Sequence, residues 1–144
     1  MSRKNVEIMR NLLPGPEVDI AQLTRDHDLW AAVSQTFAPM AHPDFECEVA
    51  WPSESSTYVG VDGLRQAFLD WTAPWESYYT EIEELIDCAD RVVALVHDRA
   101  RRQGVDGEVD VFAANMTTFR DGKIVRVEFF AHRTDALEAA GLSE

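Results

Sequence analysis

The stretch RVVALVHDRARRQGVDGEVDVFAANMTTFRDGKIVRVEFFAH, residues 91–132, decides the fold. Three runs within it alternate apolar and polar residues, as strands with one buried face do. These runs are Arg91 to Arg102, Glu108 to Arg120 and Lys123 to His132. The dipeptide Asp121-Gly122 favours a type I′ turn between the last two runs, because both of its residues tolerate positive φ. Strands joined by such short turns pair antiparallel, so the stretch predicts an antiparallel sheet.

Two further strands and several helices are predicted outside this stretch. The strands are Phe45 to Trp51, in which Phe45, Cys47 and Val49 share one face, and Tyr78 to Asp87. The residues between Pro52 and Thr57 are expected to form a polar loop. Apolar residues at helical spacing predict helices over Val6 to Leu13, Asp19 to Leu23, Leu29 to Phe37, Val61 to Ala73 and Thr134 to Ala140. Helices kept apart from a run of strands indicate an α+β fold, with the helices on one face of the sheet.

Length and charge narrow the class of protein. The chain has 144 residues, which predicts a single domain over residues 1–144. Its formal net charge of -13 repels phosphates and anionic headgroups, so nucleic acid and membranes are not expected partners. We find no signal peptide and no apolar stretch near the roughly 20 residues that a membrane span needs, so we expect a cytoplasmic protein.

Motif searches predict neither a metal nor a cofactor. Cys47 and Cys88 lie in apolar stretches and lack the spacing of a metal site or a redox pair. The chain contains no Gly-rich phosphate loop, no G-x-S-x-G and no H-E-x-x-H. Any chemistry is therefore expected to come from the side chains alone.

Six short stretches, in this order along the chain, carry a resemblance to a known family. They are Asn5 to Arg10, His42 to Glu46, Tyr58 to Trp71, Glu83 to Val93, Arg120 to Val125 and Ala136 to Gly141. With these residues the chain resembles the SnoaL-like branch of the nuclear transport factor 2-like superfamily, over nearly its whole length.

The resemblance implies a cone-shaped α+β barrel of the cystatin-like or nuclear transport factor 2-like type. In such a barrel a strongly bent antiparallel sheet wraps around helices, and a pocket opens at one end. Relatives include polyketide cyclases, ketosteroid isomerase, limonene epoxide hydrolase, dehydratases and members without known activity, so the fold does not choose the reaction. Many relatives are homodimers that pair through the outer face of the sheet, where we expect a patch of Phe112, Ala114 and Met116.

Strand alternation sorts the side chains that face the pocket. In the last strand the charged row, Ile124, Arg126, Glu128, Phe130 and His132, is expected to point outward, and Val125, Val127, Phe129 and Ala131 inward. In the preceding strand Val111, Ala113, Asn115, Thr117 and Phe119 are expected inward. Asn115 is a polar group on an apolar wall, so it either binds a ligand or bonds to the main chain.

The strand from Arg91 has two interpretations. Val92, Ala94, Val96, Asp98 and Ala100 form the more apolar row, which favours Asp98 inward as a carboxylate in a cleft of low dielectric constant. Alternatively Asp98 lies at the rim and pairs with an arginine. With the phase reversed, His97 and Arg99 enter the pocket instead.

The sequence therefore supports a pocket for a small hydrophobic molecule, with Asp98 and Asn115 as tentative catalytic residues in proton transfer of the isomerase or cyclase kind. The expected pocket-lining residues are Trp51, Tyr58, Phe68, Trp71, Ala113, Thr117, Val127 and Phe129. The aromatic residues among them are alternatively ordinary core. The alternative function is a non-catalytic dimeric module for ligand binding or interaction.

Overall fold

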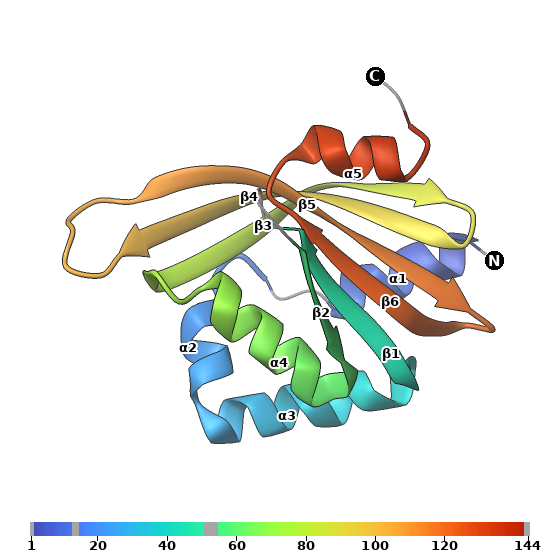
Figure 1. The fold of residues 1–144 in the computed structure, drawn as a ribbon, viewed down its shortest axis with the longest axis horizontal. Coiled ribbons are helices and arrows are strands. Elements are labelled where there is room, and N and C mark those ends of the chain that lie inside the picture. The colour runs from blue at the N-terminus through green and yellow to red at the C-terminus, as the bar shows by residue number, and fades with distance from the viewer. Residues whose placement is uncertain (1, 13–14, 51–54, 143–144) are drawn as a thin grey trace.

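The computed structural model describes residues 2–12, 15–50 and 55–142. Its centre is one six-stranded sheet with the order β2-β1-β6-β5-β4-β3. The strands are β1 (Ala41–Ala50), β2 (Ser55–Val59), β3 (Trp75–Cys88), β4 (Arg91–Arg102), β5 (Val109–Arg120) and β6 (Lys123–Phe130). The sheet is mixed and is not closed into a complete barrel, since β2 and β3 are its two edges. The predicted α+β class and bent sheet are confirmed (Figure 1).

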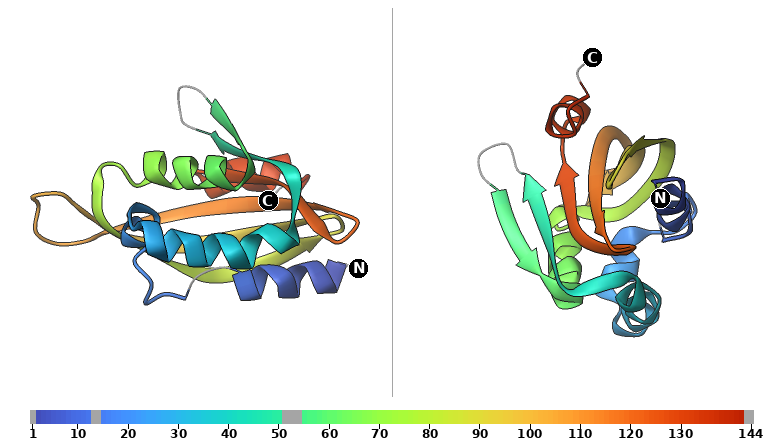
Figure 2. Two further views of the ribbon diagram at one scale, coloured as in Figure 1. Left: turned by 90° about the horizontal axis from the view of Figure 1, so that it is seen from below. Right: turned by 90° about the vertical axis from the view of Figure 1, so that its right-hand side faces the viewer.

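The helices form two layers instead of the single layer expected. They are α1 (Ser2–Leu12), α2 (Ile20–Arg25), α3 (His27–Phe37), α4 (Gly60–Trp71) and α5 (Arg133–Ala139), with a short 3₁₀ turn, η1 (Ala38–Met40), after α3. Figure 1 shows α2, α3 and α4 on one side of the sheet and α5 on the other. Figure 2 shows how strongly the sheet bends; α1 packs against β3 and β4. The expectation that all helices cover one face is therefore wrong for α5.

The position of α5 also corrects the expected outer patch. Ala136 and Ala140 pack with Ala114 and Met116 into a small second core on the outer face of the sheet. Ala114 and Met116 are thereby buried, and only Phe112 of the expected patch is exposed, by 52%. The homodimer through the outer face stays a prediction, and within one protomer α5 covers Ala114 and Met116 of the expected patch.

The antiparallel run was predicted well, and the N-terminal strands less so. β4 has its predicted bounds, and β3, β5 and β6 differ from theirs by a few residues at their ends. β1 pairs antiparallel with β2 but parallel with β6, a long-range pairing that no local pattern reveals. β2 was expected to be loop, because an edge strand rich in serine and threonine lacks an apolar row.

Capping and turn chemistry explain where the elements begin and end. The side chain of Asp19 accepts hydrogen bonds from the amides of Ala21 and Gln22 at the start of α2. It also accepts one from the amide of Tyr78, at 3.0 Å, which ties α2 to β3. Asp121 and Gly122 have φ values of 55° and 77°, as the type I′ turn requires.

A bulge changes the phase at the start of β6. Thr118 pairs with Arg126, but Phe119 pairs with Ile124, so Val125 is an extra residue on β6. Ile124 therefore points inward and is 1% exposed, which corrects its expected outward position. Beyond the bulge the predicted phase holds: Val127 joins the main core with Phe45, Cys47 and Val49.

In the part of the chain that the structure describes, no helix combines the length and the apolar character needed to cross a membrane.

Candidate functional site

A large cavity of about 460 Å³ lies between the helices and the inner face of the sheet. Helix α1 contributes Met9 and Leu12 to its wall, and α3 contributes Trp30 and Val33. The sheet contributes apolar side chains of β6 and two polar ones of β5, Asn115 and Thr117. This size and apolar character are typical of pockets that hold small organic molecules.

A second, much smaller cavity of about 70 Å³ adjoins the first. Its wall carries polar side chains: Tyr78 and Thr80 from β3, Asp98 from β4 and Thr72 at the end of α4. The two cavities share four lining residues, namely Ile20, Phe68, Asn115 and Phe129. These four side chains form a partition between the two cavities, whose walls are both mostly apolar.

Asp98 lies on the inner face of β4 and is only 3% exposed. The hydroxyl of Tyr78 donates to its Oδ2 at 2.5 Å, and that of Thr80 donates to its Oδ1 at 2.5 Å. Both donors come from β3, where Thr80 pairs directly with Asp98 and Tyr78 pairs with Ala100. The indole N–H of Trp71 donates to the Tyr78 hydroxyl at 2.8 Å, so the Tyr78 proton is directed at Asp98.

Burial sets the protonation equilibrium of this group. Loss of solvation raises the pKa of the Asp98 carboxyl above its ordinary 3.8. Hydrogen bonds from Thr80 and Tyr78, and the charges of His97 and Arg133, oppose this rise without cancelling it. Burial also raises the pKa of Tyr78, which keeps its hydroxyl protonated and able to donate. A carboxylate has about four acceptor positions, so Asp98 can still accept from a ligand.

Asn115 is one of the four partition side chains and lies on β5, the strand that pairs with the strand of Asp98. Its neighbours across the sheet are Ala94 on β4 and Phe129 on β6. The side chain is buried, and its Oδ1 accepts no hydrogen bond from the described residues. A buried amide oxygen without a hydrogen-bond donor costs free energy, so this oxygen is suited to accept a hydrogen bond from a donor group of a ligand. Because an amide has one acceptor end and one donor end, it can serve a hydroxyl or a carbonyl group.

The predicted residues distribute over the two cavities as follows. Phe68, Thr117, Val127 and Phe129 line the large cavity, and Trp71 and Ala113 line the small one. Tyr58 packs against the core and donates a hydrogen bond to Asp70 at 2.5 Å; it lines neither cavity. Trp51 lies outside the described residues. The roles of all these residues in binding stay predictions.

The structure settles the phase of β4. His97 and Arg99 point outward: His97 Nε2 lies 2.9 Å from Asp110, and Arg99 lies 3.6 Å from Glu108. The alternatives with His97 in the pocket, or with Asp98 at the rim beside an arginine, are therefore wrong.

Sequence reasoning missed Tyr78 and Thr80, which hold Asp98. The strand over these residues was recognised, but its faces were not assigned. The alternation of Tyr78, Thr80 and Ile82 with Tyr79 and Glu81 was the available signal. It would have placed the hydroxyls of Tyr78 and Thr80 on one face of β3, which is the face that Asp98 occupies on β4.

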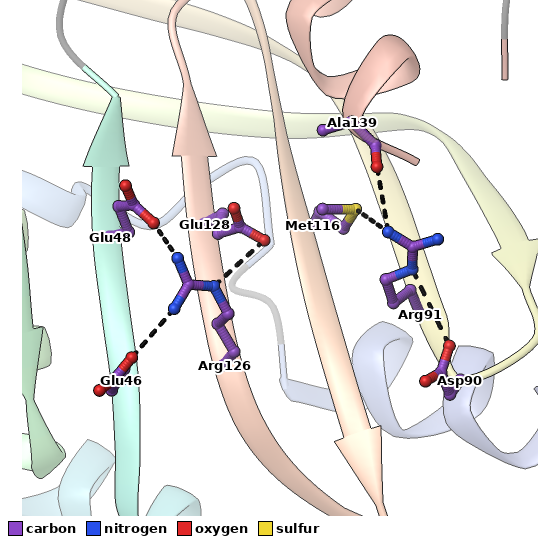
Figure 3. A network of polar contacts seen from close by, with 8 residues as sticks. All are labelled: Glu46, Glu48, Asp90, Arg91, Met116, Arg126, Glu128 and Ala139. Carbon is purple, nitrogen blue, oxygen red and sulfur yellow. Dashed lines mark hydrogen bonds and ion pairs between the residues drawn. The ribbon is translucent and has the colours of Figure 1, made fainter. Parts of the chain in front are cut away.

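The outer face of the sheet carries a contrasting arrangement (Figure 3). Arg126 on β6 contacts Glu46 at 2.9 Å and Glu128 at 3.4 Å, and forms a close ion pair with Glu48. Among the described residues no group of three or more histidine, cysteine, aspartate or glutamate side chains is arranged to hold a metal ion.

Comparison with known proteins assigns this chain to a family. The model of the SnoaL-like domain matches residues 23–127, which is well over half of the chain. The chain belongs to the SnoaL-like family. No curated protein matches it.

Solved structures share the SnoaL-like fold with this chain. A putative SnoaL-like polyketide cyclase from Jannaschia sp. CCS1 is 18% identical, with a TM-score of 0.63 over 98% of this chain and 92% of that one. A protein of ketosteroid isomerase-like fold from Catenulispora acidiphila, in complex with trimethylamine, is 16% identical, with a TM-score of 0.57 over 90% and 95%. TerC, co-crystallised with polyporic acid, is 18% identical, with a TM-score of 0.57 over 84% and 95%. At these identities the likeness shows the fold alone.

Proposed function

We propose that this SnoaL-like protein binds an apolar small molecule in the two adjoining cavities and moves a proton on it without a cofactor. Asp98 acts as the base, and Asn115 stabilises the oxyanion that forms. The observation that carries the proposal is the buried Asp98 carboxyl of raised pKa, which lines a cavity together with the side chain of Asn115.

The two groups suit this chemistry for separate reasons. A general base works best when its pKa lies near the working pH, and burial moves the pKa of Asp98 in that direction. An oxyanion is stabilised most by a fixed donor in a dry site, and Asn115 stands in an apolar wall. The polyketide cyclase and isomerase-like neighbours carry the same fold, which is compatible with this reaction but does not establish it.

The isosteric substitution Asp98→Asn tests the base. The probe is exchange of carbon-bound protons of apolar ketones with D₂O, followed by ¹H NMR. We expect the substitution to lower the exchange rate by about 10²–10⁴-fold, the usual contribution of a general base. Glu128→Gln, on the outer face, is the matched control and should leave the rate unchanged. An Asp98→Asn protein with the wild-type rate rules out the assigned base.

One observation favours a second function, ligand binding without catalysis. Both oxygens of Asp98 already accept a hydrogen bond, from Tyr78 and Thr80, so the carboxyl is satisfied before any ligand arrives. In that case tryptophan fluorescence detects binding of apolar probes, while the exchange of their protons proceeds at the buffer rate.

A further inference from the structure

Arg133 lies on the outer face of the sheet, directly behind the small cavity. It is the first residue of α5, which packs on the outer face (Figure 1). Its guanidinium donates hydrogen bonds to the carbonyl of Val96 at 2.8 Å and to the carbonyl of Ala113 at 3.3 Å. Val96 on β4 and Ala113 on β5 pair with each other, and both line the small cavity. Arg133 therefore contacts the backbone of the cavity wall from behind.

A bulge in β3 adds a third strand to this contact. The pairing of β3 with β4 skips Glu83, so this residue is an extra one on the edge strand. The carboxylate of Glu83 forms an ion pair with Arg133 at 2.6 Å, and its neighbour Ile82 lines the small cavity. Arg133 is thereby attached to β3, β4 and β5 at one level of the sheet.

The ring of Phe112 contacts the same guanidinium. Arg133 Cζ lies 5.3 Å from the centroid of this ring, and His97 stacks on the ring with 4.6 Å between the centroids. His97 in turn pairs with Asp110 at 2.9 Å. The Arg133 side chain is only 26% exposed, and its hydrogen bonds, ion pair and ring contact hold its charge in one position.

On the inner face, Asp98 meets neutral partners. Tyr78 and Thr80 present hydroxyls to it, and among the described residues that line the small cavity Asp98 is the one that carries a charge. Charges that act on the carboxyl therefore come from the outer face.

Two outer-face cations, Arg133 and His97, act on Asp98 across the sheet. Burial is the largest influence on the pKa of the Asp98 carboxyl and raises it, whereas both of these charges lower it. Arginine is always protonated in proteins, whereas histidine carries a charge only when it is protonated. Glu83 and Asp110, the acidic partners of the two cations, act in the opposite sense. Arg133 is thus the permanent positive charge of this pair.

We propose that Arg133 is a positioning residue for the inner-face site: it fixes β3, β4 and β5 behind the small cavity, and its charge favours the carboxylate form of Asp98. The inference rests on the proposed function, because Asp98 is the proposed base. Since Arg133 begins α5, displacement of α5 from the sheet would withdraw this charge, which links the outer face to the site on the inner face.

Titration of Asp98 in the full-length protein tests the inference without a substrate. The carboxyl ¹³C resonance of Asp98, assigned with Asp98→Asn, is followed by NMR over a range of pH. Arg133→Met removes the charge and keeps much of the side-chain length, so the midpoint should rise by about 0.5–1 pH unit. Arg133→Lys keeps the charge and should restore most of this shift. Arg126→Met, which removes an outer-face cation on β6, is the matched control and should leave the midpoint unchanged.

A midpoint that stays or falls in folded Arg133→Met overturns the inference and leaves the proposed base standing. A rise that Arg133→Lys does not reverse shows a purely structural role and also overturns it. Conversely, a wild-type exchange rate in Asp98→Asn removes the proposed base and leaves these shifts in place, so the two failures are distinguishable.

Glu83→Gln supplies a test of opposite sign. It removes the acidic partner and leaves the Arg133 charge unbalanced, so the midpoint of Asp98 should fall, by about 0.3 pH unit or more. Packing alone does not move the midpoint in opposite directions in the two variants. The Glu83 side chain is 41% exposed, so this variant decides the matter if Arg133→Met does not fold. A midpoint that stays or rises in Glu83→Gln overturns the inference.

Discussion

The two faces of the sheet hold carboxyl groups in opposite surroundings. On the outer face Glu46, Glu48 and Glu128 surround the guanidinium of Arg126, and all four side chains keep contact with water (Figure 3). On the inner face Asp98 is buried, and its hydrogen-bond partners are two neutral hydroxyls.

The difference is the reason for proposing Asp98, and not an outer glutamate, as the base. The outer glutamates share the cation of Arg126 and form an ion-pair network in contact with water. Neutral donors compensate only part of the lost solvation, so the pKa of Asp98 remains raised. Titratable groups with pKa values moved by burial are frequent in functional sites. The following predictions test this contrast, beginning with the largest effect.

The hydroxyl of Tyr78 should control the pH at which Asp98 ionises. A hydrogen bond to a charged group contributes about 1.5–3 kcal/mol, so Tyr78→Phe should raise the pKa of Asp98 further by about 1–2 pH units. The acid limb of the exchange rate then moves to higher pH by the same amount, which a pH profile measures. Tyr79→Phe, on the outer face of the same strand, is the control. A limb that stays in place or moves to lower pH contradicts the assigned hydrogen bond.

The stability of the fold should reveal the same burial without any substrate. The pKa of Asp98 is raised on folding, so the folded protein binds the proton more tightly than the unfolded chain does. Stability is then lost as the pH rises from the ordinary pKa of 3.8 to the folded value, and it levels off above that.

Asp98→Asn removes this titration. Relative to wild type, the variant should gain stability as the pH rises above the ordinary pKa of 3.8, by about 1.4 kcal/mol for each tenfold difference in proton affinity between the folded and unfolded states. Urea denaturation at a series of pH values measures the difference in free energy of unfolding. A difference that is independent of pH, or that falls as the pH rises, shows that burial does not raise this pKa.

The inner wall could be predicted from the sequence because it follows from local alternation. In β5 the row of Ala113, Asn115 and Thr117 was placed inward and lines the cavities. In β4 the residues that alternate with the outer row, from Val92 to Ala100, are apolar except for Asp98. This pattern correctly placed Asp98 on the inner face of the sheet. Period-two patterns survive in the fold wherever one face of a strand is buried.

The missing parts depend on pairing between distant segments. The bulge at Val125 arises from how β5 and β6 fit together, and it brings Ile124 inward against the local pattern. The position of Thr80 opposite Asp98 is set by the register of β3 on β4. The partition is formed by side chains of α2, α4, β5 and β6. No local sequence pattern predicts that these four elements contact one another. The sequence therefore indicated the catalytic candidates, whereas their partners and the size of their chamber required the structure.

The outer network should give the smallest effect and the only one that depends on salt. Arg126→Ala leaves three glutamates close together without their cation, so the free energy of unfolding should fall by about 1 kcal/mol at low ionic strength. Sodium chloride at about 1 M shortens the range of electrostatic interactions to about 3 Å, which should remove most of this loss. Arg101→Ala, which breaks one exposed pair with Glu76 at 3.0 Å, is the control and should lose less. Because Asp98 is shielded from the solvent, the same salt should leave the pH dependence of the Asp98→Asn difference unchanged. If salt altered both effects equally, the two faces would not differ in the way that their partners indicate.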